Sequence, residues 1–331
     1  MSTPATYKTY EQHLREIAEK DERVVVMTAE NRAAIRGLPP LLGRRFVDVG
    51  IAEQTMIGAA AGLALRGRRP LVHALATFLT LRAFEFIRTD LGIGKLPCVL
   101  VGGVPGFLSD GNGPTHQAIE DVSILRGIPN MQVYCPADEA ELSEALPALI
   151  ESELPTYVRH NFMKPAMGFA TGSPTPVAHK PFEWGKAEVV EEGDDVTLLT
   201  YGFLLREVLG AAKILRERGL TVRVVNMRCL KPVDEAVVIE SAKKSRLVCT
   251  IEDHFQTGGL FTIVAELCLK NRIAPRVLPM ALAERWFRPT TLPNVLKTEG
   301  FTPEAIAERV TTELGAESGR SPGRSETPAR A

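Results

Sequence analysis

Short apolar runs alternate with longer amphipathic stretches along most of the chain. In the first half, the apolar runs are rich in β-branched residues and predict strands, and the stretches between them have the length of helices. The predicted strands are residues 24–28, 46–49, 71–74, 99–102, 131–135 and 156–159. The predicted helices are residues 52–66, 79–91, 118–125 and 137–151. This alternation is typical of a largely parallel sheet covered by helices.

The second half repeats the alternation on a smaller scale. Its predicted strands are residues 196–201, 222–226, 247–252 and 277–280, and its predicted helices are residues 204–218, 234–245, 258–269 and 303–314. Residues between the halves are rich in Pro and Gly and have little periodicity, which predicts a linker. We therefore expect an α/β protein with two doubly wound domains, divided into a first domain at 1–162, a linker at 163–184, a second domain at 185–315 and a disordered tail at 316–331.

Composition narrows the class of protein. The 331 residues include 39 Lys and Arg against 40 Asp and Glu, a formal charge of −1, which argues against binding to nucleic acid or an anionic membrane. Apolar runs such as residues 97–104 are too short to cross a bilayer, and no secretory signal is expected at the polar N-terminus. The five cysteines form no CxxC pair, so we expect reduced core residues of a cytoplasmic protein.

Three segments that follow predicted strands could carry chemistry, because ligands of open α/β sheets bind beyond the carboxyl ends of the strands. The first is Asp48-Val-Gly-Ile-Ala-Glu53-Gln, which passes through Gly50 into a helix. Glu53 either stabilises the helix dipole, by about 0.3–1 kcal/mol, or projects into a cofactor pocket. The small residues Gly58-Ala-Ala-Ala-Gly62 on the same helix allow close packing, on the helix's own sheet or on another chain.

The second segment runs from Ala76 to Arg88. Phe78 falls where a strand gives way to a helix, so its ring could offer a face to a flat heterocycle. Arg82, Glu85 and Arg88 are spaced for ion pairs along a helix surface.

The third segment is a long Gly-rich loop that ends in Gly113-Pro-Thr-His116-Gln. It has neither the Gly-Lys-Ser/Thr ending of a phosphate-binding loop nor a GxGxxG spacing after the strand. His116 could act as an acid, a base or a hydrogen-bond donor near neutral pH, although an isolated histidine is more often a surface residue. His116 and Glu120 are too few ligands for a metal, so no metal site is predicted in this chain.

Taken in order, Gly-Ile-Ala-Glu-Gln, the Thr-Phe…Arg-Ala-Phe-Glu helix and Gly-Pro-Thr-His-Gln resemble the pyrimidine-binding domain of transketolases and of 1-deoxyxylulose-5-phosphate synthases. The second half, with Glu252-Asp-His254 and a Gly-Gly pair, is similar to the transketolase C-terminal domain. The resemblance covers about residues 5–314. It implies an enzyme that depends on thiamine diphosphate and transfers a two-carbon ketol unit between sugar phosphates.

The resemblance also implies roles for individual residues. A carboxyl group matching Glu53 hydrogen-bonds the pyrimidine N1′ of the cofactor, and the ring matching Phe78 packs against the pyrimidine. Ile51 and Arg82 complete the expected cofactor contacts. Residues matching His116 and Arg159 contact the substrate, the histidine near the reacting carbon and the arginine at a phosphate.

Complete transketolases also have a domain with a Gly-Asp-Gly motif that holds the diphosphate and a divalent metal such as Mg²⁺. This sequence has no such triplet, so it resembles the C-terminal subunit of a split transketolase. The resemblance then implies a partner subunit that supplies the metal and diphosphate contacts. We expect an α2β2 assembly in which two copies of this chain pair through their first domains.

One position departs from the family pattern. Four residues before His116, where ketose-using relatives usually have an aspartate that reads a substrate hydroxyl, this chain has Asn112, with Asp110 displaced by two. The donor is therefore left open between a ketose phosphate, a modified sugar and a 2-oxo acid. Two other functions also stay open, namely the beta subunit of a 2-oxo-acid dehydrogenase or decarboxylase, and a silent scaffold homologue.

Overall fold

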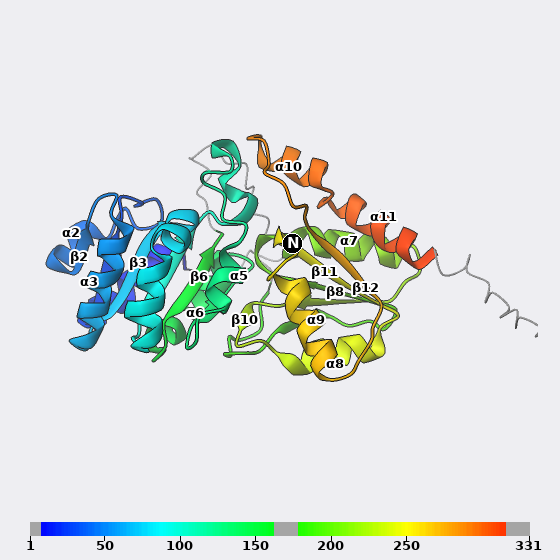
Figure 1. Ribbon diagram of the computed structural model, residues 1–331, viewed down its shortest axis with the longest axis horizontal. Helices are drawn as coiled ribbons and strands as arrows, with labels where there is room; N and C mark the ends of the chain where they lie inside the picture. Colours follow the sequence, from blue (N-terminus) through cyan, green and yellow to red (C-terminus); the bar gives the residue numbers. More distant parts are fainter. Residues whose placement is uncertain (1–7, 162–177, 316–331) are drawn as a thin grey trace, which may run out of the picture.

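The computed structural model describes residues 8–161 and 178–315, without the side chains of residues 109 and 110 (Figure 1). The predicted tail at 316–331 lies outside the described residues, as does most of the predicted linker at 163–184. Of that linker, only residues 178–184 can be compared, and there Phe182 and Trp184 pack against Tyr134.

The first half is built on a seven-stranded sheet. Six neighbouring strands are parallel, and the seventh, at one edge, runs antiparallel to its neighbour. Their order is β10 (Cys229–Lys231), β5 (Gln132–Tyr134), β6 (Thr156–His160), β4 (Val99–Gly103), β3 (Arg69–Leu75), β1 (Val24–Thr28) and β2 (Phe46–Asp48). The edge strand β10 comes from the second half of the chain, so that half completes the first sheet.

Both faces of this sheet are covered, which explains the continuous apolar strands. In β1, Val24 and Val26 belong to one core cluster, while Val25 and Met27 belong to another on the opposite face. The first face is covered by α1 (Tyr10–Lys20), α6 (Glu139–Glu151) and α2 (Pro39–Leu42). The second face is covered by α3 (Glu53–Leu65), the helical segment 78–93 and α5 (Asp121–Arg126).

The second half contains a five-stranded sheet, parallel except for its edge strand β7. The order is β12 (Val277–Leu282), β11 (Leu247–Phe255), β8 (Val196–Thr200), β9 (Val222–Asn226) and β7 (Glu188–Glu191). One face packs on α7 (Leu205–Glu217), α10 (Leu292–Glu299) and α11 (Pro303–Gly315). The other face packs on α8 (Glu235–Lys244) and α9 (Leu260–Lys270).

The predicted α/β class with two doubly wound halves is confirmed, and the halves are joined more closely than a simple linker implies. One core cluster is shared, because Leu100 and Val122 of the first half and Leu260 and Val264 of the second belong to it. Figure 1 shows the two sheets side by side, with α5 and β10 at their junction. Sequence periodicity did not predict the edge strands β7 and β10, which have only four and three residues.

Two further observations concern the surroundings of the chain. Within residues 8–161 and 178–315, no helix has both the length and the apolar character needed to cross a bilayer. All five cysteines are free and buried.

Candidate active site

The three segments singled out by the sequence follow β2, β3 and β4. These strands run parallel in one sheet, so their carboxyl ends lie at one edge. Glu53 begins α3 directly after the turn at Gly50, whose φ of +70° is the left-handed conformation that glycine adopts without strain. Its side chain is only 2% exposed, and its Oε2 accepts a hydrogen bond of 2.7 Å from Nη1 of Arg82.

Arg82 links Glu53 to two rings. Its guanidinium lies 4.4 Å from the centroid of the Phe78 ring, and that ring meets the imidazole of His116 edge to face at 5.0 Å. Glu53, Arg82, Phe78 and His116 therefore form one connected group, which we call the Glu53 cluster. Arg82 pairs with Glu53, and among the described residues Glu85 forms no ion pair with Arg82 or Arg88 of the kind that their spacing predicts.

The predicted helix at 79–91 is not a regular α-helix. The chain forms a π-helix at Phe78–Arg82, a single α-turn at Phe84–Phe86 and a second π-helix at Ile87–Ile93. The hydroxyls of Thr80 and Thr89 donate to the carbonyls four residues earlier, which disturbs regular winding. A π-turn shifts the side chains that follow it, and single π-turns are common at functional sites.

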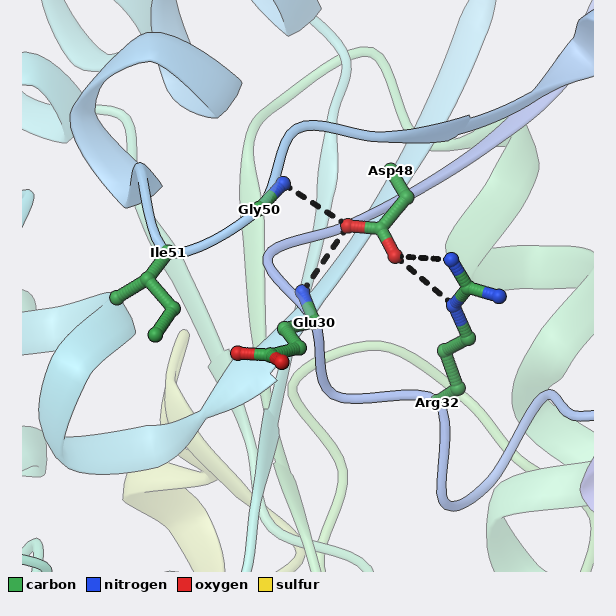
Figure 2. Close-up of a pocket in the computed structure, with 5 residues that line it drawn as sticks. All are labelled: Glu30, Arg32, Asp48, Gly50 and Ile51. Carbon is green, nitrogen blue, oxygen red and sulfur yellow. Dashed lines mark hydrogen bonds and ion pairs between the residues drawn. The ribbon is translucent and has the colours of Figure 1, made fainter.

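A depression of about 720 Å³ lies where the chain leaves β1 and β2, just before α3, and is lined by Glu30, Arg32, Asp48, Gly50 and Ile51 (Figure 2). Asp48 organises it, because its Oδ1 accepts hydrogen bonds from the amides of Glu30 at 3.2 Å and Gly50 at 2.9 Å, and its Oδ2 pairs with Arg32. Burial opposes ionisation, but these bonds outweigh it and lower the pKa of Asp48. The side chain of Ile51 is 72% exposed at the rim.

The second half of the chain supports the loop that carries His116. A Cβ on Gly113, whose φ is +75°, would lie 2.7 Å from Pro289, and Phe107 packs edge to face on Phe287 and Phe301. Nδ1 of His116 lies 2.9 Å from the Thr115 hydroxyl. His116 is not immediately before a helix as predicted, because α5 begins only at Asp121.

Asn112 is exposed at the end of a 3₁₀ turn in this loop. The described residues place no hydrogen-bond partner on its side chain.

The expectation that Arg159 binds a substrate phosphate is wrong for this structure. Arg159 is 1% exposed, its Nε donates to Asp121 at 2.8 Å, and its Nη1 donates to Asp253 at 2.7 Å. Its guanidinium also lies 5.4 Å from the Tyr201 ring. Both carboxylates are fully enclosed, so Arg159 is already neutralised and out of reach of a ligand. It joins β6 of the first sheet to β11 of the second.

We call Asp121, Arg159 and Asp253 the inter-domain triad. Burial raises the pKa of Asp253, and Arg159 opposes that rise only in part. One oxygen of each carboxylate, Oδ1 of Asp121 and Oδ2 of Asp253, has no hydrogen-bond partner among the described residues. Tyr157 adds a 2.6 Å hydrogen bond from its hydroxyl to Asp121.

Sequence reasoning missed two groups. Glu30 and Arg32 line the depression, and the polar run Glu30-Asn-Arg32 directly after the apolar strand β1 is the signal that could have found them. Asp121 and Asp253 are 132 residues apart, and only the fold brings both to Arg159.

Comparison with known proteins identifies the family. The pyrimidine-binding domain of transketolase matches residues 2–163, and the transketolase C-terminal domain matches residues 185–306. The chain belongs to the transketolase family. Members of this family use thiamine diphosphate for ketol transfer, and this chain is a transketolase-type transferase subunit.

Some of the similar proteins have about the length of this chain, and others are about twice as long. A 6-deoxy-6-sulfo-D-fructose transketolase subunit of Clostridium sp. (strain MSTE9) is 37% identical over 81% of each chain. A solved split gene transketolase, described as an inactive beta4 tetramer, is 32% identical, covers 92% of this chain and 97% of its own, and has a TM-score of 0.82. Against 1-deoxy-D-xylulose-5-phosphate synthase of Synechococcus sp. (strain JA-2-3B'a(2-13)), 36% identical, this chain spans about half the relative's length, 47% of it against 93% of its own.

A transketolase of Pichia stipitis in complex with sedoheptulose 7-phosphate shares the fold. Its TM-score is 0.71 at 19% identity, and the match covers 98% of this chain and 49% of that one. At 19% identity, this similarity shows only that the two proteins share a fold.

Proposed function

We propose that this chain provides the pyrimidine and substrate side of the active site in a two-chain transketolase. The Glu53 cluster carries the proposal, because an enclosed carboxylate, an arginine, an aromatic ring and a histidine meet at the edge of the sheet where ligands bind. Retention of all four also argues against a silent scaffold.

The residues present fit thiamine diphosphate, which when bound supplies a carbon nucleophile for the ketol unit. Oε2 of Glu53 is held by Arg82, while Oε1 accepts no hydrogen bond from the described residues and is free to meet the pyrimidine N1′. Glu53 holds a proton at that nitrogen, Phe78 offers its ring to the pyrimidine, and Ile51 adds an exposed apolar contact. His116 donates a hydrogen bond to a substrate oxygen.

The substrate is an anionic ketose whose charged end lies in the depression before α3. Its lining includes the acids Glu30 and Asp48 and one cation, Arg32, which pairs with Asp48. Arg32 is half exposed and can therefore reach a ligand, whereas Arg159 is enclosed. Phosphate and sulfonate groups both suit a guanidinium, and the sulfo-sugar relative is named for the latter. Asn112 reads a hydroxyl of the sugar.

Arg32→Gln should raise KM for an anionic ketose by roughly tenfold or more, the usual loss for a hydrogen bond to a charged group, and leave KM for a neutral analogue unchanged.

The partner subunit supplies the diphosphate contacts and the divalent cation, Mg²⁺, in an α2β2 assembly within the cytoplasm. The relative named as a subunit and the tetramer described as inactive support this division. The exposed side of α3 is the proposed contact between copies, because Gly62 is exposed and a Cβ there would meet nothing within 4 Å.

The first test mixes the purified chain with a subunit that carries a Gly-Asp-Gly diphosphate domain, in the presence of cofactor, Mg²⁺ and a donor panel. We expect ketol transfer from an anionic ketose only in the mixture. Activity with a 2-oxo acid and none with any ketose would support the dehydrogenase alternative. Turnover or tight Mg²⁺-dependent cofactor binding by this chain alone would contradict the two-chain proposal.

The second test addresses assembly. Gly62→Leu should leave the monomer folded, since the added side chain meets open space, and should abolish self-association in light scattering. Glu217→Leu, at the exposed end of α7, is the matched control and should change nothing. A wild-type chain that stays monomeric at micromolar concentration with its partner present would contradict the assembly.

A further inference from the structure

Acidic and imidazole side chains also meet far from the Glu53 cluster, where the chain enters the second half. Glu141 lies in the first turn of α6, Glu188 begins β7, and His179 lies in the segment before β7. One ligand atom from each of these three residues lies within 4.8 Å of the other two. The side chains of Glu141, His179 and Glu188 are 0%, 4% and 2% exposed, so water does not screen their charges.

The imidazole is held from both sides. Its Nδ1 lies 2.8 Å from Oε2 of Glu188, and its Nε2 lies 3.2 Å from Oδ2 of Asp138. A carboxylate on the far nitrogen of a histidine is the arrangement that orients metal-binding imidazoles in proteins. Asp138 therefore leaves Nδ1 directed at the two glutamates.

Asn226, at the end of β9, gives a second and independent observation. Its side chain is fully buried and enters the cluster, with Nδ2 at 3.0 and 3.2 Å from the oxygens of Glu141 and 3.3 Å from Glu188. Its Oδ1 is buried and has no partner among the described residues. Turning the amide by 180° exchanges the two atoms and directs an oxygen, a good cation ligand, at the same point.

We propose that Glu141, His179 and Glu188 bind a divalent first-row transition ion of the Zn²⁺ class, with Oδ1 of Asn226 as the fourth ligand. An imidazole nitrogen with carboxylate and amide oxygens favours Zn²⁺ or Co²⁺ over Ca²⁺ and Mg²⁺, which prefer oxygen alone. This site is distinct from the divalent cation assigned above to the partner subunit.

The charges around the site favour a cation. Asp138, Glu141 and Glu188 bring three carboxylates together, and Arg228 approaches only Glu141, at 3.4 Å.

The bound ion would cross-link the two halves of the chain. Glu141 belongs to a helix on the first sheet, Glu188 and Asn226 belong to the second sheet, and His179 lies in the connection between β6 and β7. A ligand that binds only the folded chain stabilises it by mass action, so the melting temperature should rise with metal concentration.

The test uses the full chain alone, stripped with a chelator and titrated with Zn²⁺ and Co²⁺ in the absence of thiamine diphosphate and partner. We expect one ion per chain by calorimetry and elemental analysis, a visible Co²⁺ absorption band and a higher melting temperature. Because no partner or cofactor is present, the result is independent of the proposed transketolase activity.

Three variants decide the ligands. His179→Gln should abolish binding, and Asp138→Asn should weaken it about 10–100-fold by releasing the imidazole. His13→Gln, on α1, is the matched control and should bind like the wild type. If His179→Gln does not fold, Asp138→Asn decides. No binding in the Zn²⁺ and Co²⁺ titrations, or binding unchanged by both variants, would leave only an ion-pair cluster around His179 and overturn the proposal.

Discussion

Arg82 and Arg159 are each paired with a carboxylate in the first half of the chain, yet their surroundings differ completely. Arg82 is 37% exposed and pairs with one enclosed acid, Glu53. Arg159 is 1% exposed and pairs with two enclosed acids, Asp121 and Asp253. The first pair is open to solvent on the Arg82 side, whereas both partners of the second are enclosed between the two halves of the molecule.

The difference teaches that pairing alone does not mark a functional arginine. A buried pair costs desolvation energy that its own attraction barely repays, so a closed pair is retained for architecture or specificity. A half-open pair next to a ring and a histidine keeps ligand-binding capacity. The Glu53 cluster is thus arranged to bind a ligand, and the inter-domain triad is arranged to hold the two halves of the chain together.

The largest expected effect is on the open pair. Glu53→Gln keeps the size of the side chain and removes the acid, so activity of the assembled enzyme should fall about 10²–10⁴-fold, the usual range for a general acid or base. Proton exchange at the thiazolium carbon, followed by NMR, measures it directly. Glu85→Gln, exposed on the same segment, is the control. Unchanged exchange would reduce Glu53 to a charge at a helix end.

Replacing Arg159 in the closed pair should lower the stability of the fold. Arg159→Met leaves two buried carboxylates without a cation and should cost about 3–5 kcal/mol in the free energy of unfolding, measured with urea. Arg82→Met should cost less, because it leaves one enclosed carboxylate rather than two and because Arg82 itself is 37% exposed. An Arg159→Met variant with the wild-type free energy of unfolding and a raised KM for phosphorylated substrates only would show that Arg159 binds the substrate phosphate after all.

Two buried histidines, His73 and His160, extend the comparison to groups that are uncharged in the folded protein. Burial lowers the pKa of His73 to about 4, and burial together with His73 lowers that of His160 to about 3. The unfolded chain takes up these protons near pH 6.5, so the stabilising contribution is complete above pH 6.5 and is lost as pH falls toward 4 and 3. Each histidine should cost about 1.4 kcal/mol per pH unit in that window. Urea unfolding between pH 7 and 5 should show a shallower dependence for His160→Gln than for the wild type.

The smallest effect is expected at an exposed pair across the same junction. Arg126 of α5 pairs with Glu266 of α9, whose side chain is 56% exposed. Glu266→Gln should change the free energy of unfolding by about 1 kcal/mol or less. A loss as large as that of Arg159→Met would mean that burial does not separate the two kinds of pair.

The sequence predicted the strands that depend on local patterning. The bounds of β1 and β9 agree with the prediction, because each strand is rich in valine and buried along its whole length. It did not predict the π-helical winding at Phe78–Arg82, which depends on threonine hydroxyls and tertiary packing. The structure brings Glu53, Phe78, Arg82 and His116 into contact with one another, and the roles that the resemblance implies for them stay predictions. The Arg159 role failed because Asp121 and Asp253 reach it only through the fold.

The close packing of Gly106 limits which segments of this protein can be exchanged for those of a relative. Gly106 has a φ of +56°, and a Cβ there would lie 1.7 Å from Oδ2 of Asp253 in the second half. A chimera that took the loop from one relative and the C-terminal domain from another would have to keep this glycine and aspartate as a matched pair. The unit of exchange between relatives is therefore the loop together with the domain that supports it.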